Sequence, residues 1–512
     1  MNSTSGTVAD IVRAWSAKTP DAPCLSFGER SWTWREIAER SSRAGHGLVA
    51  AGIRPQDRVV YLAKNGPEYF EILFGAAMAG AVSAAVNWRL SPPEIRFVIN
   101  DSQAKILFVG HEFLGQVDQI RDQLTTVETI VVLGGDYEEW LARQRPDDPG
   151  VPVSDGETAL QMYTSGTTGT PKGVMFSGAA VRSTFAMAEV TGVTPDAVVL
   201  VAMPLFHAAG ASLGIMGLAA GAHCVIAADA APSVLLSLVQ RYRATMTILV
   251  PAVLKMILTD PGSHRFDVSS LDMLAYAGSP ISPELLRACL ARFGCRFLQI
   301  YGMTETLSAT VLLPADHHDE AHPERLESAG TPLPGVSVQI VDPATGETVP
   351  DGEVGEVWVR APTAMHGYWQ LAQETVATLT ADGFVRTGDG GYLRDGYLYL
   401  RDRIKDMIVT GGENVYPAEV ERVLLEHPGV ADAAVIGVPS EKWGETVKAV
   451  VVPTEPRPDE ATLVAYARER LARFKCPTSV EFVGELPRNP SGKILKRVLR
   501  EPYWQGFERR IG

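Results

Sequence analysis

Apolar residues recur at helical spacing in some segments up to residue 400 and form short unbroken runs in others. The segment "WTWREIAERSSRAGHGLVAAG" (32–52) has the helical pattern and ends at Gly52, and "DRVVYLA" (57–63) after it is predicted to be a strand. The same alternation recurs around "AKILFVG", "TIVVLGG", "ATMTILVP" and "CRFLQIYG". Because helices that alternate with buried strands form parallel sheets, residues 1–400 are predicted to be a large α/β domain with parallel-rich sheets flanked by helices.

The pattern changes near residue 400. The segment "DGYLYLRDRIKDMIVTGGENVYPAEVERVLLEHPGV" (395–430) passes from an alternating strand through a charged turn and a glycine pair into a helix that Pro417 opens. Strand-like "AAVIGV" and "VKAVVVP" follow, then a helical segment and strand-like "SVEFVG". These elements predict a small α+β domain of about 110 residues, a usual domain size. We therefore expect a domain boundary at Leu400–Arg403, with the small domain after it.

Two apolar runs are long enough to raise the question of a membrane span. They are "EILFGAAMAGAVSAAVN" (71–87) and "GASLGIMGLAAGAHCVIAA" (210–228), and both are rich in alanine and glycine. Few of their positions hold bulky apolar side chains, so we predict core helices, with a membrane span as the second possibility.

Composition and charge narrow the class of protein. Hydrophobic residues make up 46% and charged residues 21% of the 512, as in ordinary globular proteins, and the length predicts at least two domains. A net charge of −14 argues against nucleic acid as a partner. The five cysteines form no C-x-x-C pair, and the first residues carry no basic stretch before an apolar core. We expect mostly buried, reduced thiols in a cytoplasmic protein without a secretory signal.

The segment "YTSGTTGTPKG" (163–173) combines three glycines, a row of hydroxyl side chains and Lys172 directly after an apolar run. Glycine permits a close backbone approach, and hydroxyls with one lysine suit an oxygen-rich anion such as a phosphate chain. The segment is not a Walker A loop, because that pattern requires Gly-Lys-Ser/Thr. An ordinary surface loop is the alternative.

Six further polar segments interrupt the apolar scaffold, mostly where strands are expected to end. They are "PLFHAAG" (204–210), "YAGSP" (276–280), "YGMTET" (301–306), "RTGDGG" (386–391), "RDRIKDMIVTGGENVYPAEVE" (401–421) and "PRNPSGKILK" (487–496). In order and spacing the seven segments resemble the adenylate-forming superfamily, which includes acyl-CoA ligases, firefly luciferases and peptide-synthetase adenylation domains. The match covers essentially the whole chain.

This resemblance implies a site for ATP and Mg²⁺. In "YGMTET", Tyr301 would pack on adenine beside Gly302, Thr304 would bond the α-phosphate, and Glu305 would be the magnesium ligand. A core aromatic is the alternative for Tyr301, whereas Glu305 would be a buried carboxylate with no evident partner unless a metal is there. The phosphate loop would be formed by Thr164, Ser165, Gly166, Thr167, Thr168, Gly169 and Lys172, and the adenine-side loop by Gly278, Ser279 and Pro280.

The same resemblance assigns residues in the last part of the chain. Asp389 would take the ribose hydroxyls together with Arg403, for which an ion pair with Asp402 or Asp406 is the alternative. The resemblance also implies a hinge at 401–405, in which Lys405 occupies the family's hinge position, and a mobile C-terminal domain over 406–512. Lys493 would touch both the substrate carboxylate and the α-phosphate; otherwise it belongs to a basic tail, a solvated helix face or a peripheral contact with an anionic membrane. The loop for the pantetheine chain would contain Gly411 and Gly412, or these form an ordinary turn.

The reaction implied has two steps at one site. The carboxylate of an acid attacks the α-phosphate of MgATP to give acyl-adenylate and pyrophosphate, and a thiol then displaces AMP. "TGGENVYPAEVE" and "EKWGE" look most like free-standing fatty acyl-CoA and 4-coumarate-CoA ligases, which favours coenzyme A as the acceptor. The oligomeric state is left open, with a homodimer as one possibility.

The acid itself is predicted from two stretches near the expected acyl pocket. His207 resembles the family position at the mouth of that pocket, with a hydrogen-bonded core histidine as the alternative. Small residues follow it, and neither this stretch nor "SATVLL" (308–313) holds a lysine or arginine for a second carboxylate. A medium- or long-chain fatty acid is therefore favoured, with an aryl, cinnamate-type or steroid-side-chain acid as alternatives. A luciferase-like oxygenase and a non-catalytic adenylate-binding protein are the possibilities from other classes.

Overall fold

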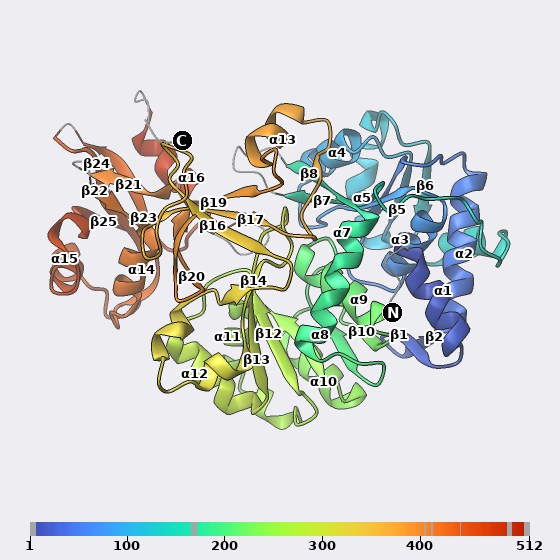
Figure 1. The fold of residues 1–512 in the computed structure, drawn as a ribbon, viewed down its shortest axis with the longest axis horizontal. Coiled ribbons are helices and arrows are strands. Elements are labelled where there is room, and N and C mark those ends of the chain that lie inside the picture. The colour runs from blue at the N-terminus through green and yellow to red at the C-terminus, as the bar shows by residue number, and fades with distance from the viewer. Residues whose placement is uncertain are drawn as a thin grey trace. The chain divides into compact units, whose positions relative to one another are not determined.

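The computed structural model describes residues 7–164, 171–403, 406–410, 413–440, 442–488 and 494–505. The chain divides into two compact units, which are drawn in Figure 1. The first contains Met1–Ser337 and Val359–Val385, and the second contains Val338–Trp358 and Arg386–Gly512. Each unit is described by itself below.

A nine-stranded sheet forms one half of the first unit. Its central strands are parallel, and β2, β14 and β15 run antiparallel at its two edges. In spatial order the strands are β15 (Thr331–Pro332), β14 (Thr310–Leu312), β13 (Arg296–Tyr301), β12 (Met273–Ala277), β11 (Met246–Leu249), β9 (Val198–Val201), β10 (His223–Ile226), β1 (Pro23–Phe27) and β2 (Arg30–Thr33).

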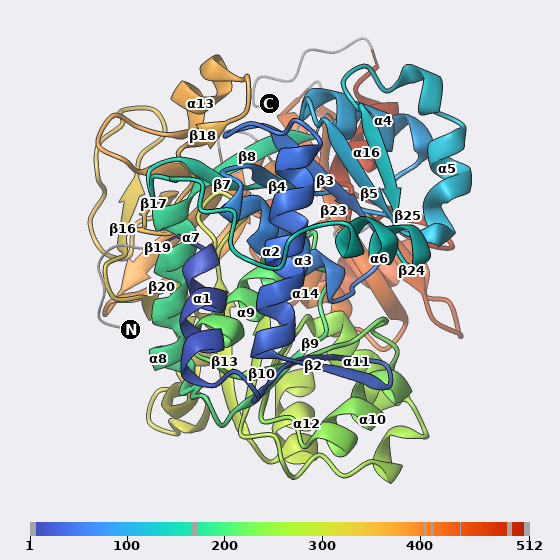
Figure 2. The same cartoon turned by 90° about the vertical axis from the view of Figure 1, so that its right-hand side faces the viewer.

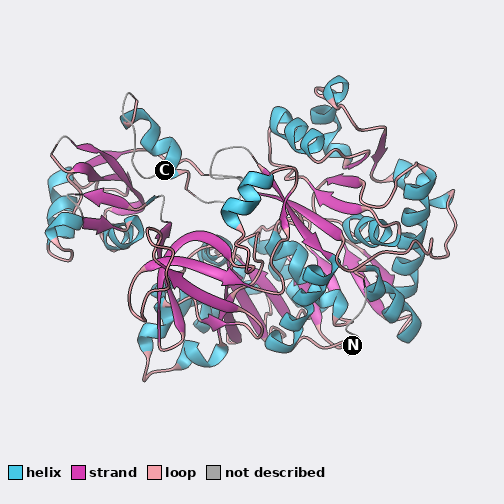
Figure 3. Ribbon diagram, turned by 45° about the horizontal axis from the view of Figure 1, so that its top comes forward, coloured by secondary structure: helices cyan, strands magenta, loops and turns pink. Residues whose placement is uncertain are grey.

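A seven-stranded sheet forms the other half of this unit. Five of its strands are parallel, while β8 and β18 are antiparallel additions at one edge. The order is β18 (Gly367–Tyr368), β8 (Lys172–Ser177), β7 (Thr158–Thr164), β4 (Val82–Ala85), β3 (Arg58–Leu62), β5 (Ile106–Val109) and β6 (Thr129–Val132). Helices flank the strands of both sheets (Figure 3), which confirms the predicted α/β class.

Three helices of the first unit lie side by side in Figure 2: α1 (Ala9–Lys18), α2 (Trp34–Ala50) and α3 (Glu68–Met78). A capping box starts α2, in which Thr33 and Glu36 exchange side-chain and backbone hydrogen bonds. The helices α2 and α3 approach so closely at Gly75 that a Cβ there would lie 2.7 Å from the Ala44 Cβ and 2.9 Å from the Gly45 nitrogen. Glycine at this crossing is therefore required by packing.

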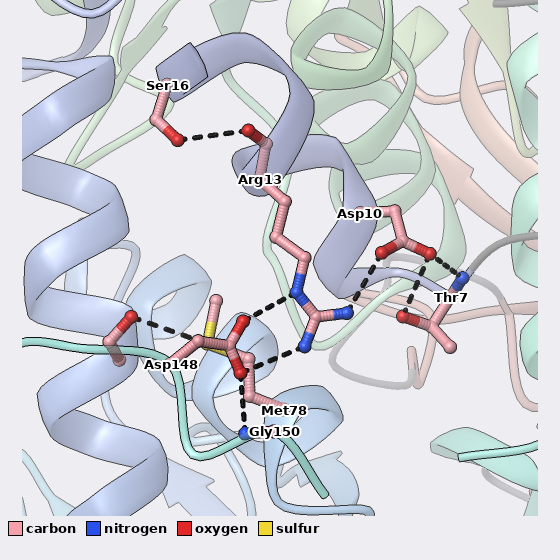
Figure 4. Close-up of polar contacts among 8 residues, drawn as sticks. Thr7, Asp10, Arg13, Ser16, Met78, Asp148 and Gly150 are labelled. Atoms are coloured by element: carbon pink, nitrogen blue, oxygen red, sulfur yellow. Dashed lines mark hydrogen bonds and ion pairs between the residues drawn. The ribbon is translucent and has the colours of Figure 1, made fainter. Parts of the chain in front are cut away.

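An ion pair attaches α1 to the connection that follows the helix α6 (Gly135–Ala142). Arg13 Nε donates to Asp148 Oδ2 at 2.6 Å, and its Nη1 donates to Asp10 at 2.9 Å (Figure 4). Asp148 also accepts from the Gly150 nitrogen at 2.8 Å. The N-terminal helix and this connection, far apart in sequence, are thereby held together.

The two apolar runs of the sequence are each a buried helix followed by a buried strand. The first run gives α3 and then β4, and the second gives α9 (Ala208–Ala219) and then β10. The prediction of core helices is therefore right for the first part of each run. In the part of the chain that the structure describes, no helix has both the length and the apolar character needed to cross a membrane.

The second unit is built on two smaller sheets. The first has the order β16 (Ser337–Val341), β17 (Gly355–Arg360), β19 (Val385–Arg394) and β20 (Tyr397–Arg403). The second has β22 (Glu413–Val415), β21 (Ile408–Thr410), β24 (Gly444–Pro453) and β23 (Val430–Ser440), with β25 (Ser479–Phe482) paired to β24. Its helices include α14 (Pro417–Leu425), α15 (Glu460–Arg468) and α16 (Lys496–Arg500), so the expected elements after residue 400 are present. The strand β20 runs across the boundary expected at residue 400, and the hinge at 401–405 stays a prediction.

Candidate active site

Two of the sequence-predicted segments meet at the carboxyl ends of adjacent parallel strands. β12 pairs with β13 so that Ala277 lies opposite Ile300, which brings Gly278 and the loop after it next to Tyr301. Gly278 has φ +87°, a backbone conformation that other residues rarely adopt. Ser279 and Pro280 are exposed, and Tyr301 is half-buried. Ligands of α/β proteins usually bind at such strand ends, so this edge is suited to a ligand.

The segment 301–309 folds back on itself directly after β13. The Ala309 nitrogen donates to the Tyr301 carbonyl at 2.8 Å, and Leu307 has φ +56°. A Cβ on Gly302 would lie 1.7 Å from the Leu307 carbonyl oxygen, so this position accepts only glycine. The fold-back leaves Thr304 half-buried and buries Glu305, which is 7% exposed.

Glu305 has a hydrogen-bond partner that sequence reasoning missed. The Tyr368 hydroxyl donates to Glu305 Oε1 at 2.8 Å, and the Met365 nitrogen donates to the Glu305 carbonyl at 2.8 Å. The expectation that this carboxylate has no partner without a metal is therefore wrong. Nothing in the sequence marked Tyr368, because 63 positions separate the two residues.

The donor set around Glu305 nevertheless fits a magnesium ion that accompanies a nucleotide. Mg²⁺ is usually bound by one or two carboxylates together with substrate phosphates and water, and a buried carboxylate is such a ligand. Among the described residues, no group of three or more His, Cys, Asp or Glu side chains could hold a metal ion by itself. The residues present thus suit a cation shared with phosphate.

The flanks of the predicted phosphate loop are two paired strands. Thr164 ends β7 and Lys172 begins β8, and the two residues lie opposite each other in an antiparallel pair. The Lys172 ammonium lies 5.1 Å from the centre of the Tyr368 ring. On the other flank, the Tyr163 hydroxyl donates to Asp101 Oδ2 at 2.6 Å, and burial raises the pKa of this tyrosine well above its ordinary value. Both flanks are therefore fixed by contacts outside the loop.

His207 precedes α9 and is half-buried, with its ring 4.5 Å from that of Phe206. The first turn of α9 presses against the chain before it, since a Cβ on Gly210 would lie 2.3 Å from the Pro204 carbonyl oxygen. The helix then runs along a cavity in the first unit. His207 itself does not line this cavity, and its predicted position at the mouth of the acyl pocket stays a prediction.

The cavity beside α9 has a volume of about 200 Å³ and no charged residue in its lining. Of the two stretches predicted to form an acyl pocket, Ser212 and Ser308 do line it. Most other lining residues come from elements that sequence reasoning did not connect with the pocket, among them Met187, Val190, Met216, Met246, Ile248 and Leu333. In the sequence these residues have only their apolar character in common. Core residues are apolar too, so the sequence alone could not assign these residues to a pocket.

In the second unit, Asp389 lies on β19 opposite Arg403 of β20. The Asp389 nitrogen donates to Thr387 Oγ1 at 3.0 Å, and the Thr387 hydroxyl donates to the Val357 carbonyl at 2.7 Å. The backbone of the two residues predicted to hold the ribose is therefore side by side.

Residues 12–369 match the family model of the AMP-binding enzymes, and residues 419–493 match the AMP-binding enzyme C-terminal domain. The chain belongs to the AMP-binding enzyme family. The predicted membership of the adenylate-forming superfamily, in its acyl-CoA ligase branch, is thus confirmed. The chain is accordingly an AMP-forming enzyme of the acyl-CoA synthetase type.

Individual relatives cover nearly the whole chain. Fatty acid–[acyl-carrier-protein] ligase ScoC of Streptomyces coeruleorubidus is 41% identical over 503 residues, which are 96% of this chain and 95% of that protein. Feruloyl-CoA synthase of an Amycolatopsis species is 40% identical over 492 residues, 95% of this chain and 96% of that protein. The crystal structure of ATP-bound MatB from Rhodopseudomonas palustris has a TM-score of 0.88 at 30% identity and covers 98% of this chain and 100% of its own.

Several predicted site residues of this AMP-binding enzyme lie outside the described part of the chain. They are the loop residues Ser165, Gly166, Thr167, Thr168 and Gly169, the hinge residue Lys405, the glycines Gly411 and Gly412, Lys493, and the side chain of Arg403. Their roles stay predictions.

Proposed function

We propose that this enzyme activates a predominantly apolar monocarboxylic acid, with a medium- or long-chain fatty acid as the favoured substrate. An oxygen of its carboxylate attacks the α-phosphorus of ATP, and pyrophosphate leaves. The sulfur of coenzyme A then attacks the acyl carbonyl carbon, and AMP leaves as the thioester forms. A cytoplasmic location is part of the proposal, and the burial of four of the five cysteines agrees with it.

The observation that carries this proposal is the uncharged cavity beside α9. Its lining is mostly methionine, isoleucine, leucine, valine, alanine and proline, with serine and threonine hydroxyls between them. Thr363 and Thr184 use their hydroxyls on backbone carbonyls, at 2.7 and 2.6 Å. A second carboxylate would meet no cation here, and burying it unpaired is costly, so a monocarboxylic apolar acid fits best.

An aryl acid is the second candidate. Feruloyl-CoA synthase is nearly as similar to this chain as the fatty acid ligase is, and adaptable methionine side chains can also pack against a ring. The two candidates differ in shape, because an alkyl chain can bend around the cavity wall whereas a ring system cannot.

The residue roles within the reaction are proposed from the family resemblance. Tyr301 stacks on adenine, Thr304 binds the α-phosphate, and Lys493 holds the two reacting anions together. Mg²⁺, held by Glu305 and the phosphates, neutralises charge on the phosphate oxygens. Asp389 and Arg403 hold the ribose, and Lys172 contacts the phosphates.

A panel of acids tests the proposed substrate class. AMP release is measured with saturated acids of increasing length, with cinnamic-type acids and with dicarboxylic acids, each with and without coenzyme A. We expect coenzyme A-dependent AMP release to be fastest with a medium- or long-chain saturated acid. Turnover only with ring acids, or only with dicarboxylic acids, would refute the fatty acid proposal, and turnover only with a carrier-protein thiol would refute coenzyme A as acceptor.

A cavity-filling variant tests whether the acyl group of the substrate binds in this cavity. In Ser212→Phe the new ring occupies the space beside α9, so kcat/KM for long-chain acids should fall at least about tenfold, since one badly placed methylene in an apolar pocket costs about that much. Short acids should be nearly unaffected. Ser237→Phe on the exposed face of α10 (Pro232–Tyr242) is the control. An equal loss for short and long acids would place the acyl group elsewhere.

A further inference from the structure

The segment 363–369, here called the bridging segment, connects Glu305 with the strand that leaves the phosphate loop. At one end, the Thr363 hydroxyl donates to the Thr306 carbonyl at 2.7 Å, and the Met365 nitrogen donates to the Glu305 carbonyl at 2.8 Å. At the other end, the Trp369 nitrogen donates to the Gly173 carbonyl at 2.7 Å. The strand β18 within the bridging segment pairs antiparallel with β8. One short segment thus fixes the positions of both Glu305 and β8.

The bridging segment is also linked, through Asp101, to the strand that enters the loop. The Trp369 indole nitrogen donates to the Asp101 carbonyl at 2.8 Å, and Asp101 accepts the Tyr163 hydroxyl at 2.6 Å. The Arg58 guanidinium lies 3.4 Å from the centre of the Trp369 ring. These contacts make the bridging segment a fixed support rather than a surface loop.

Tyr368 contacts two of the predicted phosphate-site residues with one side chain. It is 6% exposed, its hydroxyl donates to Glu305 Oε1 at 2.8 Å, and the Lys172 ammonium lies over its ring at 5.1 Å. Among the described residues, no other side chain or backbone group donates a hydrogen bond to the Glu305 carboxylate. The phenol therefore sets the plane of the carboxylate through Oε1 and leaves Oε2 for another ligand.

The orientation of this carboxylate matters because the cation has few protein ligands. No cluster of three candidate ligands exists among the described residues, so a cation here depends on one well-placed carboxylate plus phosphate and water. Groups that hydrogen-bond a metal-ligating carboxylate fix its direction, and their loss typically costs about 10- to 100-fold in metal affinity.

We propose that Tyr368 is a positioning residue of the adenylation step, whose hydroxyl holds the Glu305 carboxylate in the orientation that binds the divalent cation of the nucleotide. The proposal rests on the proposed role of Glu305 as magnesium ligand. It goes beyond the seven polar segments of the sequence, none of which includes Tyr368. The ring of the same tyrosine also lies under the ammonium of Lys172 at the start of β8.

The test is Tyr368→Phe, which keeps the ring, its packing and the surface under Lys172 and removes the hydroxyl. At saturating ATP and acid, the Mg²⁺ concentration for half-maximal pyrophosphate release should rise about 10- to 100-fold. In a second readout without turnover, binding of Mn²⁺ to the enzyme with a non-hydrolysable ATP analogue, followed by electron paramagnetic resonance, should weaken by a similar factor. Thioester formation from preformed acyl-adenylate should be unchanged.

The chain offers a matched control in Tyr137→Phe. Tyr137 is fully buried and donates to Glu71 Oε2 at 3.0 Å, so this variant also removes a buried Tyr–Glu hydrogen bond. Both variants should lose stability to a similar extent, as measured by melting temperature, and only Tyr368→Phe should change the Mg²⁺ requirement. If Tyr368→Phe lowers only the melting temperature, the phenol merely satisfies a buried carboxylate and the proposal is wrong.

A double-mutant cycle decides whether Tyr368 acts through Glu305. In the Glu305→Gln background, Tyr368→Phe should produce no further change in Mn²⁺ affinity, because the group that it orients is already gone. An additive further loss would overturn the proposal. Failure of the proposed function is distinguishable, because it would appear in the acid panel as turnover with ring acids or dicarboxylic acids alone. The Mn²⁺ measurement needs no acid and does not depend on that result.

Discussion

Two carboxyl groups in the first turn of α3 have different surroundings. Glu71 is fully buried and accepts hydrogen bonds from Arg40 Nε at 2.6 Å and from the Tyr137 hydroxyl at 3.0 Å. Arg40 in turn binds Glu138 at 2.7 Å. Burial raises the pKa of Glu71 despite these partners. For Glu68, burial together with the nearby Glu71 raises the pKa to about 7. The folded protein therefore favours the neutral form of Glu68.

The pKa of Glu68 gives a pH-dependent prediction. Its ordinary pKa is 4.5, so between pH 4.5 and about 7 the folded state retains a proton that the unfolded state has lost, and stability falls as pH rises. Glu68→Gln removes this effect. The variant should be more stable than wild type at pH 8, by an amount on the order of 3 kcal/mol at ~1.4 kcal/mol per pKa unit. The difference in stability between the variant and wild type, followed as a difference in melting temperature, should become smaller towards pH 5.

The control for this measurement is Glu39→Gln, which changes an exposed carboxyl group on α2. It should show no gap in melting temperature that grows with pH. A Glu68→Gln variant that melts below wild type at pH 8 would show that the carboxylate is charged and stabilising in the folded protein.

At the residue scale, the sequence predicted those site residues that lie together in one local motif. It missed a residue that reaches the site from a distant part of the chain. Tyr301, Thr304 and Glu305 stand within one hexapeptide, and their grouping next to Gly278 follows from the adjacent positions of β12 and β13. Tyr368 and Glu305 are 63 positions apart in the sequence. A hydrogen bond between residues so far apart produces neither a periodic pattern nor a local motif in the sequence. The partner of a buried carboxylate therefore had to come from the structure.

At the scale of elements, α9 shows how a helix without a polar face is held. Apart from Ala208, Ala209 and Ser212 it is buried, and its glycines pack against neighbouring side chains. A Cβ on Gly214 would lie 2.4 Å from Phe70 Cζ, and one on Gly217 would lie 2.8 Å from Cys224 Sγ. The sequence predicted this burial from the apolar run. It did not predict that each long run divides into a helix and a strand, because apolar character alone does not show where a buried helix stops.

Gly214→Ala tests this packing. The added methyl group would overlap the fully buried Phe70 ring, which has no space to move, so we expect a loss of about 1 to 3 kcal/mol in stability. Because α9 also lines the cavity, kcat/KM for long acids should fall as well. The measurement is the melting temperature together with the acid panel.

Gly115→Ala is the matched control for that substitution. Gly115 lies in the helix α5 (Leu114–Asp118), is exposed, and has no heavy atom within 4 Å of the position that a Cβ would take. Alanine there should be neutral or stabilising by up to about 1 kcal/mol, since alanine favours helix. If both variants behave alike, α9 is not closely packed at Gly214.

At the scale of the whole molecule, the chain passes between its two compact units more than once. Val338–Trp358 belongs to the second unit, Val359–Val385 returns to the first, and Arg386 begins the second again. The sheet β16-β17-β19-β20 pairs strands that come before the returning segment Val359–Val385 with strands that come after it. The sequence indicated the α+β texture after residue 400 but not these earlier strands, because pairing between distant segments has no local signal. The bridging segment (363–369) lies within Val359–Val385, so Tyr368 belongs to the first unit.

The division of the reaction into two steps is tested by variants in the second unit. Lys493, which lies outside the described residues, is proposed to hold the carboxylate and the α-phosphate together while charge develops on the phosphate oxygens. Losing such a stabilising contact typically costs about 100- to 1,000-fold. Lys493→Ala should therefore abolish most acid-dependent pyrophosphate release and largely spare thioester formation from preformed acyl-adenylate, in which the acyl–phosphate bond already exists. Arg497→Ala, an exposed cation on α16 of the same basic tail, should change neither step.

Gly412→Leu should give the opposite pattern, because a side chain at the proposed pantetheine loop obstructs the thiol but not the nucleotide. Gly412 also lies outside the described residues, so the prediction rests on the family resemblance. Both half-reactions are measured in the same preparations, pyrophosphate release for the first and AMP release from supplied acyl-adenylate for the second. If Lys493→Ala loses mainly the first step and Gly412→Leu mainly the second, then different residues of the second unit serve the two steps. This is the pattern expected when the domain alternates between two arrangements. Equal losses of both steps in either variant would instead mean that one arrangement of the chain serves the whole reaction, and the two-conformation assignment would be wrong.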